Sequence, residues 1–337
     1  WYYKSIAEQL ELSLNKTGAF KELIKHINFI WPGSFDSDKA RYRKYREVSV
    51  EGCKQIGRGA KGDVYRYDDE LIIKVYNQNN TYGDVEQEIA MARKAFILGV
   101  PTAISFGIVS VGEKYGAMYE LVDSETFSSC IARNPGQLEF YARLMAELAH
   151  TIHGTEATAE DGFPAGMDRA RGYIEGGIGR ENAALAGKVM ALLDALPDPG
   201  TLLHGDFHTN NVFLQRGEPL LIDMDRLSIG HPILELSDLY YFYVLLGEES
   251  PAVVERFMGF SYDTAQRFMR AFLKSYLGTE EEDRLNAVAD KASLIGYSRL
   301  IRKLRKQREL AESDRQLIRR CVERIAELTE KLGTLAF

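Results

Sequence analysis

Three glycines, Gly57, Gly59 and Gly62, follow the spacing G-x-G-x-x-G, and the residues around them alternate as β-strands do. A strand near residues 64–67 follows the glycines, where a dinucleotide-binding fold needs a helix and an acidic residue about 20 positions further on. Glycine lets the backbone approach a ligand closely, so amides can cover phosphate oxygens. The segment from Gly57 to Val64, called the glycine loop below, therefore predicts a phosphate-covering β-hairpin.

A single cation, Lys74, interrupts the apolar run Leu-Ile-Ile-Lys-Val-Tyr. Burying an unpaired ammonium group is costly, so this lysine needs an anionic partner unless it faces water at the edge of a sheet. We expect it to pair with ligand phosphates and with an acid on the following helix. Glu88 is favoured over Glu86 because Val85 and Ile89 of the apolar helix face flank it.

The pattern of apolar and polar residues divides the chain into three parts. Apolar residues in the first 30 positions recur at three- and four-residue steps, which predicts helix. Strand patterns with one helix follow, and beyond Asp123 the chain reads mostly as helix, with a loop and hairpin in residues 202–230. We expect a helical N-terminal extension at 1–47, a β-rich lobe at 48–122 and a mainly helical lobe at 123–337.

The composition of the chain disfavours some classes of binding partner. The formal net charge of -7 disfavours nucleic acid, because phosphate backbones recruit clustered Lys and Arg. No run of about 18 apolar residues and no signal peptide occurs, so no membrane partner is expected. Three distant cysteines without metal-ligand spacing predict reduced thiols and a cytoplasmic location. The first residue is Trp1 rather than Met, so we expect a fragment that a further domain could precede; the oligomeric state stays open.

Two short motifs contain the side chains best suited to catalysis and metal binding. The first, His-Gly-Asp-Phe-His-Thr-Asn-Asn, spans residues 204–211 and is called the histidine loop below; the second, Ile-Asp-Met-Asp, ends at Asp225. Phosphoryl transfer to a hydroxyl needs a carboxylate that accepts a proton and oxygen ligands for Mg²⁺. Asp206, Asn211 and Asp223 supply these groups. Asp225 is either a second metal ligand or a supporting residue.

The pattern H-G-D-x-H-x-x-N followed by I-D-x-D resembles the aminoglycoside phosphotransferase and choline kinase superfamily, a branch of the protein-kinase-like fold. The resemblance covers about residues 50–310 and includes the glycine loop, Lys74 and G-H-P-x-x-E-L-x-D-L. It implies an α+β, two-lobed fold with a β-rich N-lobe and a mainly helical C-lobe. The family often has Asp where this chain has Glu235. Protein kinases would instead show HRD and DFG, so the histidine loop favours a small-molecule acceptor.

The resemblance also implies the roles of residues. Asp206 is expected to be the catalytic base, and Asn211 and Asp223 the Mg²⁺ ligands. The 48–122 lobe is expected to bind ATP, with GTP as an alternative, and the 123–337 lobe to bind the acceptor. The expected nucleotide-binding residues are Gly57, Gly59, Gly62, Val64, Lys74, Glu88, Met118, Glu120 and Val122. The backbone from Glu120 to Val122 would be the hinge behind adenine, unless Met118 and its neighbours are only strand core.

The expected function is transfer of the γ-phosphate of ATP to a hydroxyl of a small molecule, such as an aminoglycoside, amino alcohol or sugar. A protein kinase is disfavoured because the stretch from Asp223 to Pro232 is too short for an activation segment. A nucleotide-binding pseudokinase that acts through a protein partner is disfavoured, because a degraded active site would be expected to lack at least one of four residues. All four are present: Lys74, Asp206, Asn211 and Asp223. The aromatic residues 240–243 are either acceptor-facing or core.

Overall fold

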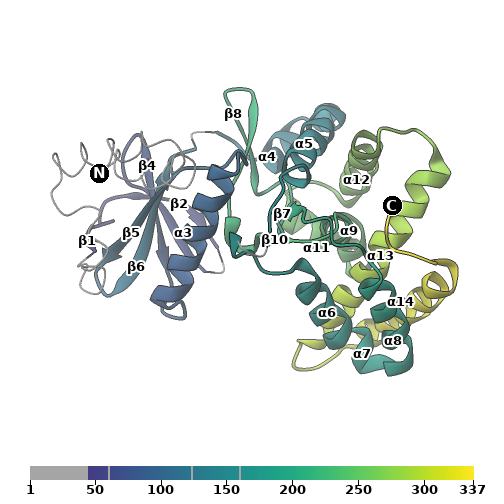
Figure 1. Cartoon of the computed structure of the whole chain (residues 1–337). Helices are drawn as coiled ribbons and strands as arrows, with labels where there is room; N and C mark the ends of the chain where they lie inside the picture. Colours follow the sequence, from purple (N-terminus) through teal and green to yellow (C-terminus); the bar gives the residue numbers. More distant parts are fainter. Residues whose placement is uncertain (1–44, 60, 123, 159–160) are drawn as a thin grey trace. The chain divides into compact units, whose positions relative to one another are not determined.

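The structure is a computed structural model that describes residues 45–59, 61–122, 124–158 and 161–337. These fall into two compact units (Figure 1). The first comprises the described residues up to 122 together with Leu220–Asp225, and the second comprises Ser124–Pro219 and Arg226–Phe337. The predicted helical extension lies outside the described residues except for positions 45–47, where Arg46–Glu47 form the short strand β1.

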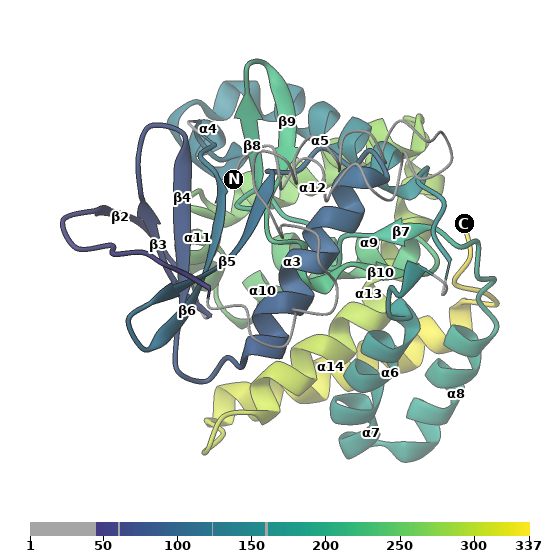
Figure 2. The ribbon, with the colours of Figure 1, turned by 60° about the vertical axis from the view of Figure 1, so that its left-hand side comes forward.

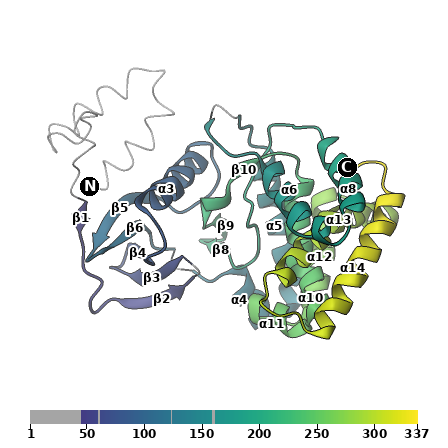
Figure 3. The same cartoon turned by 90° about the horizontal axis from the view of Figure 1, so that it is seen from below.

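A six-stranded sheet, in the order β1-β5-β6-β4-β3-β2, forms the base of the first unit (Figure 3). Its strands are β1 (Arg46–Glu47), β2 (Lys54–Arg58), β3 (Gly62–Arg66), β4 (Leu71–Tyr76), β5 (Ser105–Val111) and β6 (Lys114–Glu120). Neighbouring strands are antiparallel except β1 and β5, which are parallel. The strand predicted after the glycines is therefore present, and the β2–β3 hairpin lies at one edge of this sheet.

One helix, α3 (Tyr82–Ile97), packs against β5 and β6 of this sheet (Figure 1). A capping box starts it: Thr81 Oγ1 accepts the N–H of Asp84, and the Asp84 carboxylate accepts the N–H of Thr81. Val85 and Ile89 are buried on the face that meets the sheet, as the four-residue spacing predicts. The helix thereby carries one row of its side chains into the interior of the first unit.

The second unit is built mainly from helices. These are α4 (Phe127–Arg133), α5 (Leu138–His153), α6 (Gly166–Gly176), α7 (Ile178–Glu181), α8 (Ala183–Asp194), α9 (Ile233–Tyr240), α10 (Leu246–Glu249), α11 (Pro251–Met258), α12 (Tyr262–Leu277), α13 (Glu282–Arg305) and α14 (Glu312–Lys331). The long α13 packs against α6, α9 and α14, and α12 packs against α5 (Figure 2). Among the described residues, no helix has the length and apolarity needed to cross a bilayer.

Short strands hold the two chemical motifs. The histidine loop begins directly after β7 (Leu202–Leu203), which pairs antiparallel with β10 (Ser228–Ile229). It ends at β8 (Val212–Gln215), which forms a two-stranded sheet with β9 (Glu218–Leu221). The loop and hairpin predicted within residues 202–230 are therefore present. The Ile-Asp-Met-Asp motif follows β9 and leads into a short 3-10 turn, Met224–Arg226.

Candidate active site

The glycine loop joins β2 to β3, and its last glycine is fixed by packing. A Cβ on Gly62 would lie 2.1 Å from the carbonyl oxygen of Val75 in β4, so no side chain fits there. Gly59 instead closes the loop by donating its N–H to the Gly62 carbonyl oxygen at 2.8 Å. A Cβ on Gly59 would meet nothing closer than 3.7 Å. Strand packing therefore requires Gly62, whereas the space around Gly59 leaves its backbone free to approach a ligand.

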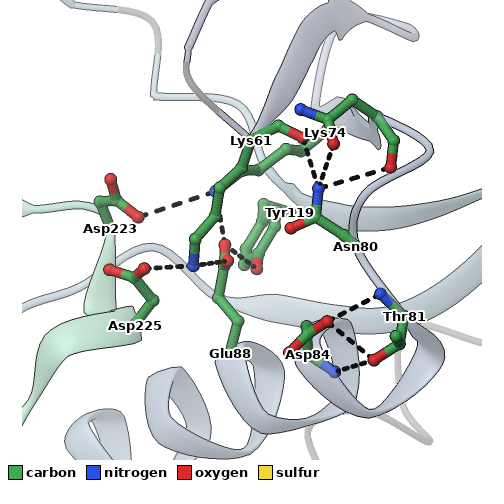
Figure 4. Close-up of polar contacts among 10 residues, drawn as sticks. Lys61, Lys74, Asn80, Thr81, Asp84, Glu88, Tyr119, Asp223 and Asp225 are labelled. Carbon is green, nitrogen blue, oxygen red and sulfur yellow. Dashed lines mark hydrogen bonds and ion pairs between the residues drawn. The ribbon is translucent and has the colours of Figure 1, made fainter. Parts of the chain in front are cut away.

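Lys74 and Glu88 form a buried ion pair. Lys74 Nζ lies 2.5 Å from Glu88 Oε1, and the Glu88 side chain is only 4% exposed (Figure 4). Glu86, the rejected alternative, is exposed and accepts a hydrogen bond from the hydroxyl of Tyr82. A cation can therefore lie within the apolar strand β4 because α3 supplies its counter-charge.

Tyr119 also contacts the Glu88 carboxylate of this ion pair. Its hydroxyl lies 3.5 Å from Glu88 Oε1. Burial, and next the negative charge of Glu88, raise the pKa of Tyr119 well above its ordinary value. The hydroxyl therefore stays protonated and can donate toward the carboxylate.

Asp223 follows β9 in an unusual backbone conformation. Its φ of 65° lies in the left-handed region, which residues other than glycine rarely adopt. Such strain costs about 1–3 kcal/mol and persists where the surroundings hold it, often at functional sites. Asp223 Oδ1 lies 3.7 Å from Lys74 Nζ (Figure 4). In this backbone conformation the Asp223 carboxylate lies beside the Lys74–Glu88 pair.

Three carboxylates of the first unit converge. Oxygens of Glu88, Asp223 and Asp225, called the carboxylate cluster below, lie within 4.8 Å of one another. The Oδ1 atoms of Asp223 and Asp225 are both buried and receive no hydrogen bond from the described residues, and the Lys74 ammonium group reaches the Asp223 atom only as an ion pair at 3.7 Å. Buried oxygens without a donor are costly unless a cation or water meets them. Oxygen donors of this kind are the ligands that Mg²⁺ prefers.

Lys61 of the glycine loop also reaches the carboxylate cluster, a contact that was not predicted from the sequence. Its Nζ lies 3.3 Å from Glu88 Oε2 and contacts Asp225 Oδ2 (Figure 4). Burial lowers the pKa of Lys61, but the nearby carboxylates of Asp225 and Glu88 outweigh it, so the pKa is raised. The available signal was a lone cation between Gly59 and Gly62.

In the second unit, Glu235 anchors the histidine loop. Its side chain is fully buried and accepts the N–H groups of His204 at 3.2 Å and Gly205 at 2.6 Å. Burial raises the pKa of Glu235. The hydrogen bond and the charge of His153 lower it by more than burial raises it, so the pKa is lowered overall. Glu235, which stands where the family often has Asp, is therefore an ionised acceptor of two loop amides.

Gly205 allows the loop to pass very close to neighbouring groups. It adopts a φ of 77°, and a Cβ there would lie 2.3 Å from the Arg226 carbonyl oxygen and 2.6 Å from the guanidinium of Arg169. The residue before Asp206 must therefore be glycine for both conformational and steric reasons.

Asp206 keeps its carboxylate partly open while its backbone is held. Its N–H donates to His204 Nδ1 at 3.2 Å, and Asn211 Nδ2 donates to its carbonyl oxygen at 2.9 Å. The side chain is 20% exposed, and Arg226 Nη1 and His208 Nε2 each lie 3.8 Å from Oδ1. Because Asn211 uses its nitrogen here, its Oδ1 is the atom it can offer to a cation.

Of the aromatic residues 240–243, Tyr241, Phe242 and Tyr243 are buried and Tyr240 is half-buried, and two of the buried rings contact the histidine loop. Tyr243, in a π-helical turn at Tyr241–Leu245, is fully buried and donates to Thr209 Oγ1 at 2.9 Å. Its oxygen accepts the Thr209 N–H at 2.9 Å. The His208 ring contacts Phe242 and Phe257 edge-on, each with 5.0 Å between centroids.

The remaining predicted nucleotide residues lie on the sheet of the first unit. Met118 is fully buried beside Ile73 in its core. Val64 and Val122 are half-buried, and Glu120 ends β6 with its N–H bonded to the Ile104 carbonyl oxygen. Their contact with a nucleotide stays a prediction.

The first unit has a sheet with the glycine loop at one edge and a buried lysine–glutamate pair. It is the β-rich lobe of a protein-kinase-like fold, and the second unit is the mainly helical lobe. Within that class, the chain belongs to the phosphotransferase enzyme family (APH), whose model matches residues 52–287. No curated protein matches the chain in a sequence comparison.

Solved structures agree on the fold. The ADP-bound structure of aminoglycoside phosphotransferase APH(2'')-Ib is 14% identical, with a TM-score of 0.54, over 91% of this chain and 98% of that one. The streptomycin–ATP complex of APH(2'')-IIa is 12% identical, with a TM-score of 0.51, over 91% and 97%. A choline/ethanolamine kinase family protein from Mesorhizobium loti is 14% identical, with a TM-score of 0.50, over 83% and 92%.

Proposed function

We propose that this chain is a Mg²⁺-dependent small-molecule kinase that transfers the γ-phosphate of ATP to a hydroxyl group. The observation that carries the proposal is the Lys74–Glu88 pair beside two buried oxygens, Asp223 Oδ1 and Asp225 Oδ1, that receive no hydrogen bond from the described residues. That arrangement offers one cation for phosphate oxygens and two anionic oxygens for a metal ion, which are the parts that phosphoryl transfer uses. The family match supports the same reaction class.

ATP is the proposed donor, with GTP as the alternative. Lys74 would bind its phosphates, and the amides near Gly59 would cover them. Met118, Glu120 and Val122 would hold the base at the end of β6, and Val64 would cover it. The complexes of similar proteins with ADP and with ATP support a nucleotide in this fold.

Asp223 and Asn211 are each proposed as Mg²⁺ ligands, and Asp225 is proposed as a further oxygen donor. The buried Oδ1 atoms of both aspartates receive no hydrogen bond from the described residues and fit a hard divalent cation. Bound Mg²⁺ would neutralise phosphate charge and orient the transferred group. The left-handed backbone of Asp223 would keep its carboxylate aimed without further ordering on binding.

Asp206 is the proposed catalytic base. It would accept a hydrogen bond from the acceptor hydroxyl, orient the oxygen and take its proton. The Asn211 bond and the Glu235 anchor on the preceding residues hold the Asp206 backbone in place. The partly exposed carboxylate leaves room for an acceptor.

The proposed acceptor is a small molecule with a hydroxyl group, of the aminoglycoside, amino-alcohol or sugar class, and we propose a cytoplasmic location. Similar structures named for streptomycin binding and for choline or ethanolamine kinases support these classes. The alternatives are a protein kinase and a nucleotide-binding pseudokinase. The short segment between Asp223 and Pro232, and the retention of Asp206, count against both.

The test is ATP turnover with Mg²⁺ across a panel of aminoglycosides, amino alcohols and sugars, with Asp206→Asn alongside. We expect one class to stimulate turnover, and the variant to lose it by about 10²–10⁴-fold while its nucleotide affinity stays within about threefold. Asp198→Asn, an exposed substitution outside both motifs, is the matched control. Equal loss of turnover and nucleotide binding would reject Asp206 as base. Tight ATP binding with no turnover on any acceptor or protein would favour a pseudokinase.

A further inference from the structure

We propose that Lys61 is a phosphate-exchanging lysine: without nucleotide it neutralises Asp225 and Glu88, and a nucleotide phosphate takes the place of Asp225 as its partner. This role rests on the proposed function, because it requires the chain to bind a nucleotide. It adds a second lysine to the phosphate site and makes metal binding dependent on nucleotide binding.

The contacts of Lys61 join three distant segments of the first unit. Its ammonium group meets Asp225 after β9 and Glu88 on α3, at sequence separations of 164 and 27 positions (Figure 4). The two oxygens of Glu88 are divided between two lysines, Oε1 for Lys74 and Oε2 for Lys61. Three carboxylates therefore share two ammonium groups, and a single negative charge is left over.

Lys61 and a metal ion compete for the same acid. Asp225 Oδ2 is engaged by Lys61, whereas the Oδ1 atoms of Asp223 and Asp225 receive no hydrogen bond from the described residues. A divalent cation at these oxygens would lie close to the Lys61 ammonium group and be repelled by it. Phosphate oxygens offer the lysine an alternative anionic partner of comparable or greater charge. Nucleotide binding would therefore release the aspartate oxygens to the metal.

The side chain of Lys61 can make this exchange without movement of its backbone. The Lys61 carbonyl oxygen accepts a hydrogen bond from the N–H of Asn77 at 2.8 Å. It also accepts one from Nδ2 of Asn80 at 3.0 Å (Figure 4). The side chain itself is 39% exposed, compared with 17% for Lys74. Lys74 is thus the more enclosed cation, and Lys61 is the one that can rotate toward a ligand.

The test uses Lys61→Met, which keeps an unbranched side chain as far as Cε and removes the ammonium group. Mn²⁺ binding to the nucleotide-free protein is measured by electron paramagnetic resonance, and binding of ATP, ADP and AMP by calorimetry. We expect Mn²⁺ to bind about tenfold or more tightly in the variant. ATP affinity should fall by about tenfold, and AMP affinity should change by less than about twofold. Lys61→Arg should stay near wild type because it retains the charge.

Lys54→Met, an exposed lysine in the same hairpin, is the matched control and should leave every value unchanged. Circular dichroism of each variant checks that the fold is retained. If wild type binds ATP but Lys61→Met matches it in both Mn²⁺ and ATP affinity, the exchange is wrong and the proposed function stands. Tighter Mn²⁺ binding with unchanged ATP affinity also overturns it, because the phosphate is then not the new partner. If wild type does not bind ATP, the proposed function fails first.

Discussion

The carboxylate of Glu235 accepts the backbone N–H of Gly205 at 2.6 Å, although 30 positions separate the two residues in sequence. The same carboxylate accepts the N–H of His204 and lies 3.1 Å from Nε2 of His153. The N-terminal end of the histidine loop is thus fixed by one fully buried anion on α9. Glu235 has one methylene more than an Asp would have, and it still accepts both backbone hydrogen bonds.

Replacing Glu235 by Gln should destabilise the fold and slow turnover. Glutamine has one acceptor oxygen, and its amide nitrogen would face a backbone N–H or the His153 ring, so a buried donor loses its partner. We expect a loss of about 3 kcal/mol in the free energy of unfolding, measured by urea titration. Glu235→Asp should lose less because it keeps the charge. An unchanged unfolding midpoint in Glu235→Gln would show that the anchor contributes nothing.

The glycine loop should respond differently at two of its glycines. Gly62→Ala places a methyl group against β4, so we expect a loss of about 1–3 kcal/mol in unfolding free energy. Gly59→Ala meets no atom closer than 3.7 Å and should retain stability while it weakens ATP binding. Thermal unfolding and calorimetry separate the two effects. Equal stabilities in the two variants would contradict the packing role of Gly62.

Asp223→Gly should separate folding from metal binding. Glycine adopts a φ of 65° without strain, so we expect the variant to be as stable as wild type or more stable, by up to about 1 kcal/mol. The dependence of ATP affinity on Mg²⁺ should disappear because a proposed ligand is lost. Calorimetry with and without Mg²⁺ measures this dependence, and Asp69→Gly in the exposed β3–β4 turn is a control. Retained Mg²⁺ dependence would remove Asp223 from the ligand set.

Stability should fall in mild acid because of His231. Burial, then the nearby charges of His153 and Lys291, lower the pKa of His231 to about 4 from 6.5. The unfolded chain therefore takes up a proton below about pH 6.5 that the folded chain accepts only near pH 4, so stability is lost as pH falls through this window.

His231→Asn should flatten that loss, and its oxygen can still accept the Ile233 N–H that His231 Nδ1 accepts now. Urea titrations at pH 7 and pH 5 give the difference. The exposed His150→Asn is the comparison variant. A loss between the two pH values as large as in wild type would assign the acid sensitivity to other groups.

Local patterns were sufficient to predict several elements of the first unit. The alternation after the glycines predicted a strand, which is β3, and four-residue spacing predicted α3 with Val85 and Ile89 inward. The apolar neighbours of Glu88 selected it over Glu86, and the Lys74–Glu88 ion pair is present. The assignment of substrate and metal roles to these residues stays a prediction.

The sequence by itself determined the strand and helix periods, the family motifs and the choice of Glu88, because those signals lie within a few neighbouring residues. Only the tertiary structure decided the partners of Lys61, the packing need for glycine at position 62 and the loop-anchoring role of Glu235. Each of these depends on contacts between segments far apart in the chain, such as Lys61 and Asp225 at 164 positions. The physical reason is that charge pairing and close packing act through space, so their partners leave no local pattern in the sequence.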